Sequence, residues 1–196
     1  MASVIANMSM SLDGFVADPS DSVDLLFGWY FTGTVPVPTS DQRLTFQLSD
    51  ASAKHMRKVQ ESVGAVICGR RLFDVAGGWG GRHPMGVPAF VVTHEAPRDW
   101  NRPDAPITFV TDGVASAVAK AKATAGDRTV AIASADITQQ CLNEGLVDAI
   151  QVDLVPVLMG EGIRFFDKLS KMPITLDDPD VVEGTGVMHL YYPVLK

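Results

Sequence analysis

The chain has little cysteine and no long apolar run. Its 196 residues include two cysteines, Cys68 and Cys141, and neither has a Cys-x-x-Cys partner. Because isolated cysteines in apolar segments are usually buried thiols, we expect neither a disulfide nor a thiolate metal site. No segment approaches the ~20 consecutive apolar residues of a membrane span, and the N-terminus lacks the basic and apolar regions of a signal peptide. We therefore expect a cytoplasmic protein that does not bind membranes.

Positive charge is also scarce. The chain has 16 Lys and Arg residues against 23 Asp and Glu, a formal net charge of −7, and no run of basic residues. Nucleic-acid binding depends on basic patches, so we expect no nucleic-acid partner. An anionic ligand would have to be held by local arginines and by backbone N–H groups.

The motifs of several common sites are missing. There is no Gly-x-Gly-x-x-Gly after a strand, no Walker A sequence, no His-Glu-x-x-His and no Gly-x-Ser-x-Gly. A hydrolase or transferase reading therefore has no nucleophile–base motif behind it. The four histidines lack metal-ligand spacing, so we interpret each as a surface or hydrogen-bonded residue and predict no metal site: His55, His83, His94 and His189.

What the sequence does contain is an alternation of strand-like and helix-like segments. Apolar runs of strand length lie at residues 4–10, 65–68, 88–93, 107–110, 130–133 and 150–155. Helical spacing lies between them at residues 50–63, 70–75 and 114–125, and in a short segment before Gly145. Two β-rich runs, 174–182 and 187–194, flank Gly184-Thr185-Gly186, which is typical of a hairpin. The pattern predicts one α/β domain over residues 1–196, with a mostly parallel sheet and an antiparallel C-terminal hairpin.

Residues 22–48 are predicted to be irregular. The segment contains Trp29, Tyr30 and several prolines, and its aromatic content argues against disorder. A long loop in a compact domain is usually functional. Two interpretations remain open: the segment is a surface flap over the core, or it forms the aromatic wall of a ligand pocket in which Trp29 and Tyr30 contact a substrate.

Three predicted strands end in residues that suit phosphate. Gly69 follows one strand directly, and Arg70 and Arg71 come next, although a pair of ordinary surface arginines is the alternative. Thr93-His94 ends the next strand, and residues 134–137 lead from a third strand into a helix. A helix N-terminus binds anions through free N–H groups, and ligands of open α/β sheets lie at the carboxyl ends of strands. The sequence thus favours a nucleotide site.

Four motifs resemble those of the dihydrofolate reductase-like family. They are SLDGFVA (11–17), GRRLFD (69–74), VVTH (91–94) and GLVDAIQVDLVPVLMGEG (145–162). The resemblance extends over nearly the whole chain and is greatest to the branch that contains the C-terminal reductase domain of RibD. It implies a three-layer fold around a mostly parallel sheet, NADPH in an extended groove, and often a homodimer.

The resemblance also implies site residues. The segment that meets the adenosine phosphates of NADPH corresponds to Gly69, Arg70, Arg71 and Leu72. The segment beside the adenine corresponds to Thr93 and His94. The turn under the pyrophosphate corresponds to Ser134, Ala135, Asp136, Ile137 and Thr138. The motif near the nicotinamide and substrate corresponds to Ser11, Asp13 and Ala17, and the small residues of a later loop to Gly160 and Gly162.

The chain departs from the family at several of these positions. Ala133-Ser134 stands where two glycines are usual, so a Cβ stands at the pyrophosphate turn, whereas the serine hydroxyl offers a phosphate hydrogen bond. Leu72 replaces a common threonine. Asn7 and Ile132 stand where riboflavin-pathway enzymes have lysine and glutamate, which argues against a pyrimidine ribityl phosphate substrate.

The sequence therefore predicts an NADPH-dependent reductase that transfers a hydride to a small heterocyclic or carbonyl substrate, in a CH-OH or CH-NH type reduction. Arg70 and Arg71 favour the 2′-phosphate of NADPH over NADH. Asp13 is the candidate polar or proton-handling residue at the reacting centre, and the alternative is a turn residue that holds Gly14 in place. A non-catalytic ligand-binding protein that kept the fold is the second hypothesis, supported by the changes at Ala133-Ser134.

Overall fold

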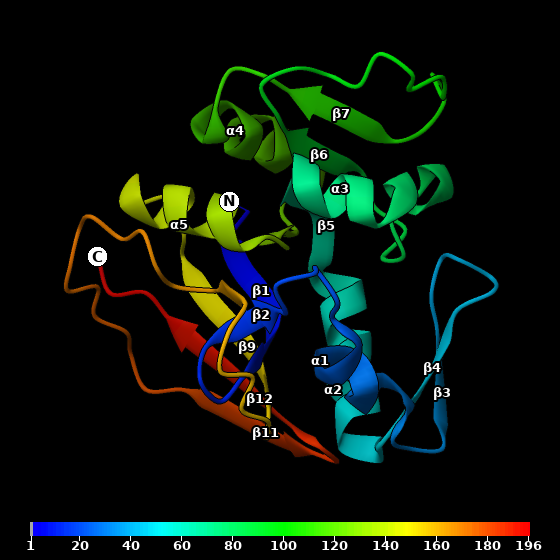
Figure 1. Cartoon of the computed structure of the whole chain (residues 1–196), viewed down its shortest axis with the longest axis vertical. Coiled ribbons are helices and arrows are strands. Elements are labelled where there is room, and N and C mark those ends of the chain that lie inside the picture. Colours follow the sequence, from blue (N-terminus) through cyan, green and yellow to red (C-terminus); the bar gives the residue numbers. More distant parts are fainter. Residues whose placement is uncertain (1) are drawn as a thin grey trace.

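The computed structural model describes residues 2–196, and its central feature is an eight-stranded sheet in the order β11-β12-β9-β1-β8-β5-β6-β7 (Figure 1). Six strands are mutually parallel: β1 (Val4–Ser11), β5 (Val63–Gly69), β6 (Ala89–Val92), β7 (Ile107–Val110), β8 (Thr129–Ile132) and β9 (Ala149–Val155). The last two, β11 (Asp180–Gly184) and β12 (Val187–Pro193), form an antiparallel hairpin that pairs with β9. The predicted sheet and C-terminal hairpin are confirmed.

Helices cover both faces of this sheet. The longer ones are α2 (Asp50–Ser62), α3 (Arg70–Val75), α4 (Val114–Ala125) and α5 (Ala135–Asn143). Shorter elements are α1 (Asp24–Phe27) and the 3₁₀ helices η1 (Gly28–Phe31) and η2 (Gly77–Gly81), and two small sheets pair β2 (Phe15–Ala17) with β10 (Ile163–Arg164) and β3 (Val35–Pro38) with β4 (Thr45–Leu48). Among residues 2–196, no helix has the length and apolar character that crossing a bilayer requires.

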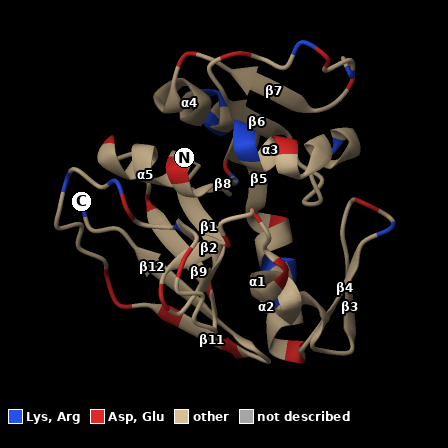
Figure 2. Ribbon diagram, in the orientation of Figure 1, with Lys and Arg blue, Asp and Glu red and all other residues tan. Residues whose placement is uncertain are grey.

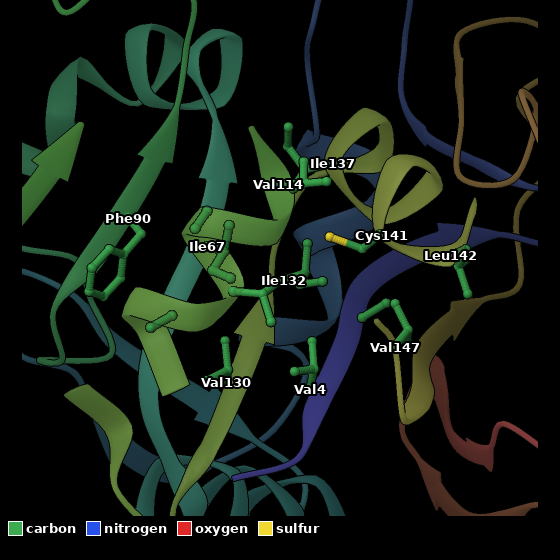
Figure 3. Packing of buried hydrophobic residues seen from close by; sticks show 14 of the residues in the cluster. Val4, Ile67, Phe90, Val114, Val130, Ile132, Ile137, Cys141, Leu142 and Val147 are labelled. Atoms are coloured by element: carbon green, nitrogen blue, oxygen red, sulfur yellow. The ribbon is translucent and has the colours of Figure 1, made fainter. Parts of the chain in front are cut away.

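The main core lies between the sheet and the helices α4 and α5 (Figure 3). Val4, Val130 and Ile132 of the central strands pack there with Ile137 and Cys141 of α5. As predicted, Cys141 and Cys68 are buried, unpaired thiols, and burial raises the pKa of each thiol to about 12.

A second core lies on the opposite side of the β9–β12 end of the sheet. It joins residues from the segment 24–48 and from α2 to the two strands, and its fully buried members include Leu26, Val37 and Leu48. The prediction that residues 22–48 are irregular was therefore wrong, because α1, η1 and the β3–β4 hairpin lie within them. Pro36 and Pro38 obscured the hairpin, yet β3 pairs with β4 alone, and proline is tolerated in such an edge strand.

Two element boundaries also differ from the prediction. The first long helix ends at Ser62, and β5 begins at Val63, so the strand starts before the predicted range 65–68 and includes Gly64. A Cβ on Gly64 would lie 2.9 Å from the Cα of Ala125, which shows how closely β5 approaches α4. Of the predicted strand 174–182, only the part from Asp180 onward is a strand, and Leu176 forms an isolated bridge.

Candidate functional site

The predicted cofactor residues gather at one edge of the sheet. The strands β1, β8, β5 and β6 are neighbours, and their carboxyl ends carry the turns that the sequence singled out. Gly69 at the end of β5 pairs in register with Val92 of β6, and Ile67 pairs with Ile132 of β8. Parallel strands end at the same edge of a sheet, which is where open α/β sheets bind ligands.

The end of β5 lies directly against the start of α5. A Cβ on Gly69 would lie 3.1 Å from the Oγ of Ser134 and 3.4 Å from the Cγ1 of Ile137. The backbone N–H of Ala133 donates a hydrogen bond of 2.9 Å to the carbonyl of Ile67, which fixes the strand-to-helix turn. Two of the predicted phosphate segments are thus in contact, and glycine at position 69 permits that contact.

The N-terminus of α5 carries hydrogen-bonding groups that remain available for a ligand. Ser134 is the N-cap residue in an extended conformation, and within residues 2–196 its side chain makes no capping hydrogen bond. The first backbone N–H groups of a helix have no partner inside the helix. Asp136 adds negative charge to the first turn, although it accepts a hydrogen bond from Gln140 at 2.6 Å. Thr138 is fully buried and its Oγ1 has no partner within the described chain.

These observations test whether the turn fits the pyrophosphate of a dinucleotide. The free N–H groups of residues 135–137, the positive end of the helix dipole and the unpaired Ser134 hydroxyl all suit an anion. The side chain of Ser134 lies beside Gly69, since its Oγ is 3.1 Å from the position that a Cβ on Gly69 would take. The residues present therefore fit a phosphate group.

Arg70 and Arg71 at the start of α3 already have partners, and Figure 2 shows that α3 carries both basic and acidic residues. The Nε of Arg70 donates to Asp74 at 2.8 Å and its Nη1 to the carbonyl of Glu95 at 3.1 Å. The Nε of Arg71 donates to Asp21 at 2.9 Å. Such exposed ion pairs contribute little stability, so a phosphate can compete for both guanidinium groups.

The remaining residues of these segments differ in exposure. The Oγ1 of Thr93 donates to the carbonyl of Glu95 at 2.8 Å, and His94 is exposed just after β6. The side chain of Leu72 packs with Phe73 and its aromatic neighbours in a small apolar cluster, and its place in the phosphate segment stays a prediction.

The second group of predicted residues meets at the turn between β1 and β2. The carboxylate of Asp13 accepts hydrogen bonds from the Ser11 hydroxyl at 2.6 Å and from the backbone N–H groups of Met159 and Gly160 at 3.1 and 2.7 Å. The Ser11 hydroxyl first, and then the Gly160 N–H, lower the pKa of Asp13 to about 2. These contacts are those of the turn-holding alternative, and a proton-handling role for Asp13 stays a prediction.

Ala17 and Gly162 complete this group. A Cβ on Gly162 would overlap the carbonyl oxygen of Ala17, and the residue has a φ of 138°, so both space and conformation require glycine. Gly160 has a φ of 77°, but no atom lies within 4 Å of the position that a Cβ would take there. The loop after β9 thus lies directly against β2.

The side chain of Gln139 links this loop to α5, the helix that begins after the Ser134 turn. The Nε2 of Gln139 donates to the carbonyls of Arg164 and Phe165 at 3.1 and 3.0 Å, and its Oε1 accepts from the N–H of Lys168. The N–H of Phe165 in turn donates to the carbonyl of Gly14 at 3.0 Å. Sequence reasoning missed Gln139, which carries no motif.

Trp29 and Tyr30 pack onto the sheet on the α2 side. Trp29 is 2% exposed, and its Nε1 donates to the Oγ of Ser9 at 3.1 Å. Its ring stacks on Tyr30, with centroids 4.1 Å apart, and Tyr30 stacks on Phe46 at 4.2 Å. Burial raises the pKa of Tyr30. The geometry is that of a flap over the core, and contact with a substrate stays a prediction.

A buried polar cluster lies beside this flap. The Nδ1 of His189 donates to the Oδ1 of Asp153 at 2.7 Å, and its Nε2 lies 2.9 Å from the Oγ of Ser52. The ring of His55 stacks on that of His189, with centroids 4.2 Å apart. His55 and His189 are thus hydrogen-bonded residues, as predicted, but the packing of α2 on the sheet brings the two rings together, which no motif in the sequence indicated. The signal was the polar residues at alternate positions of β9, Gln151 and Asp153.

Two surface cavities lie away from the predicted residues. One of about 320 Å³ is lined by residues that include Leu142, Gly145 and Pro173. The other, of about 270 Å³, is lined by apolar residues that include Leu12, Leu154 and Met188. Neither contains a predicted site residue.

Comparison with solved structures defines the class of the fold. The chain matches a putative riboflavin biosynthesis protein from Shewanella sp. PV-4 with 21% identity and a TM-score of 0.72 over 100% of both chains. It also matches dihydrofolate reductase from Enterococcus faecalis, in a complex with NADP(H) and RAB-propyl, with 11% identity and a TM-score of 0.55, over 99% of this chain and 97% of that one. The fold is therefore dihydrofolate reductase-like.

The family assignment is more specific. The RibD C-terminal domain family matches residues 2–182, so the chain belongs to that family. A diaminohydroxyphosphoribosylaminopyrimidine deaminase/5-amino-6-(5-phosphoribosylamino)uracil reductase from Thermotoga maritima matches with 10% identity and a TM-score of 0.64, over 99% of this chain and 57% of that longer one. No curated protein sequence matches. The resemblance identified from the sequence motifs is confirmed.

Proposed function

We propose that the protein is an NADPH-dependent reductase that transfers a hydride to a small heterocyclic or carbonyl substrate. The observation that carries the proposal is the contact between Gly69 at the end of β5 and the uncapped N-terminus of α5. It brings two anion-compatible segments together at the carboxyl edge of a parallel sheet. Membership of a reductase-domain family supports the same reaction class.

In this proposal the N–H groups at the start of α5 and the Ser134 hydroxyl bind the pyrophosphate of the cofactor. Arg70 and Arg71 exchange their carboxylate partners for the adenosine phosphates, including the 2′-phosphate, because guanidinium groups suit phosphate geometry. Thr93 and His94 lie beside the adenine. The bound cofactor supplies the hydride, and the protein orients it and the substrate.

The other end of the cofactor lies at the β1–β2 turn. Ser11, Ala17, Gly160 and Gly162 would surround the nicotinamide, with Asp13 holding the turn and adding a negative charge near the reacting centre. Two features support a substrate other than a riboflavin intermediate. They concern Asn7 and Ile132, which stand where riboflavin-pathway enzymes have lysine and glutamate. Ile132 is fully buried in the main core, and the Nδ2 of Asn7 is buried without a partner in the described chain, so neither residue supplies the charge of its counterpart.

We also propose that two copies associate. Leu12 is 62% exposed and Met188 is 40% exposed, and both line the apolar cavity at the β12 end of the sheet. A second copy would cover this surface. Light scattering of the purified protein tests the proposal, and a monomer mass at all concentrations would contradict it. The buried, unpaired thiols are consistent with a reducing compartment such as the cytoplasm.

The direct test is a titration with NADPH followed by nicotinamide fluorescence. We expect saturable binding, tighter for NADPH than for NADH because of Arg70 and Arg71. No binding at high micromolar NADPH would refute the reductase. If NADPH binds, its oxidation with a panel of pterins, quinones and small carbonyls separates an enzyme from the second candidate. That candidate is a non-catalytic ligand-binding protein, favoured by the side chain at position 134.

A further inference from the structure

Polar side chains occupy three adjacent strands beneath α2. Ser9 of β1 lies opposite Asp153 of β9, which lies opposite His189 of β12. Asp153 is 4% exposed and His189 is 1% exposed. Burying such groups is costly unless they are paired or bind an ion. This part of the molecule plays no part in the proposed cofactor site, although it lies on the same sheet.

Three potential metal ligands converge in this cluster. One ring nitrogen of His55, one of His189 and a carboxylate oxygen of Asp153 all lie within 4.8 Å of one another. No other set of three such residues does so within residues 2–196. Two imidazoles and a carboxylate suit zinc, whereas magnesium and calcium prefer oxygen ligands alone. We propose that His55, Asp153 and His189 form a binding site for Zn²⁺.

The groups around the three ligands support the proposal. A metal-bound histidine usually directs its other ring nitrogen to a hydrogen-bonding partner, which fixes the orientation of the ring. The Nε2 of His189 has such a partner in the Oγ of Ser52, so its Nδ1 is the nitrogen that faces Asp153. The Nε2 of His55 lies 3.1 Å from the Nε2 of Gln151. His189 therefore has the supporting contact of a metal ligand, whereas the amide N–H of Gln151 donates to a lone pair of the His55 ring.

Zinc binding requires a limited rearrangement. The two rings are nearly parallel, with an interplanar angle of 16°, so their lone pairs do not yet converge. His189 is fully buried and held at both nitrogens, whereas His55 is only partly buried at the rim of the cluster. Zinc bonds of about 2.0–2.2 Å are reached when the His55 ring turns toward Asp153 and the bonded Asp153–His189 pair opens slightly.

The electrostatics of the cluster favour a divalent cation. A Zn²⁺ site combines neutral imidazole with ionised carboxylate ligands, and the cluster offers both types. The charge of Asp153 would offset part of the charge of the ion. The ion would join α2 to β9 and β12, with its fourth position left for water.

The test uses the full-length protein, stripped of metal by a chelator, and ZnCl₂ in isothermal titration calorimetry. We expect one ion per chain, and with Co²⁺ the visible absorption bands of a tetrahedral site. Replacing a ligand in His55→Ala should weaken zinc binding by more than about 100-fold, and Ser52→Ala by about 10- to 100-fold, as expected for a group that supports a ligand. The matched control His94→Ala removes an exposed histidine outside the cluster and should leave the affinity unchanged.

Three results would overturn the proposal: no saturable binding of Zn²⁺ or Co²⁺, binding that survives His55→Ala, or an equal loss in His94→Ala. The first would leave the cluster as a hydrogen-bonded network only. If His55→Ala unfolds, as judged by circular dichroism, His55→Gln replaces it, because the amide keeps a polar contact with Gln151 and offers no imidazole. The test does not involve NADPH, so its outcome is independent of the reductase activity.

Discussion

Gly162 offers the sharpest test of the geometry at the β1–β2 turn. The substitution Gly162→Ala places a Cβ against the carbonyl oxygen of Ala17, and the φ of 138° is one that alanine rarely adopts. Backbone strain of this kind costs about 1–3 kcal/mol, and overpacking costs about 1–3 kcal/mol more. We therefore expect the free energy of unfolding to fall by about 2–6 kcal/mol.

A neighbouring glycine provides the control. Gly160→Ala also introduces a side chain at positive φ, but no atom lies within 4 Å of its Cβ. This variant should lose only the free energy that alanine costs at a positive φ, about 1–2 kcal/mol of stability. The difference between the two variants therefore isolates the overlap with Ala17.

Thermal and urea unfolding measure both variants. At about 2–4 °C per kcal/mol for a chain of this size, Gly162→Ala should lower Tm by about 5–15 °C, and Gly160→Ala by clearly less. Equal losses would show that the contact with Ala17 relaxes without cost. The reasoning that places β2 against the loop after β9 would then be wrong.

Three further predictions concern other parts of the molecule. Gly69→Ala puts a Cβ 3.1 Å from the Oγ of Ser134. We therefore expect NADPH to bind at least about tenfold more weakly, while circular dichroism shows an unchanged fold. An unchanged affinity for NADPH would show that this contact is not part of the cofactor site. The pKa of His55 is lowered in the folded protein. As the pH falls, His55 therefore takes up a proton in the unfolded chain before it does so in the folded protein. Stability should therefore fall as the pH drops through the unfolded value of about 6.5, and urea unfolding of His55→Gln should lose this component. Trp29→Phe removes the hydrogen bond to Ser9 and should cost about 1–3 kcal/mol in urea unfolding; a neutral result would show that this hydrogen bond adds no net stability.

The sheet could be predicted because its strands are short apolar runs separated by helices with clear ends. In β5 and β8 almost every residue is apolar, which is the pattern of a strand covered on both faces. The β3–β4 hairpin could not be predicted, because Pro36 and Pro38 are normally read as breaking a strand. The structure explains these prolines, because β3 pairs with β4 and with no other described strand, and such an edge strand tolerates proline.

The part of the candidate site that could be predicted consists of residues at the ends of strands. Gly69 and Ser134 each follow a strand, so their meeting at the sheet edge follows from strand direction. The cluster of His55, Asp153 and His189 could not be found this way, since it depends on how α2 packs across β9 and β12. The alternating Gln151 and Asp153 indicate a buried polar group on β9, but nothing in the local sequence indicates which residues of α2 and β12 meet it.

The side chain of Gln139 has a consequence for ligand binding. Through its contacts with the loop at residues 164–168, and through Phe165 and Gly14, it connects the start of α5 to the β1–β2 turn by hydrogen bonds. The two ends of a dinucleotide would thus meet a single preassembled frame rather than two loops that order separately. Less conformational entropy would be lost on binding, so a chain with few basic residues can reach useful affinity through rigidity instead of charge.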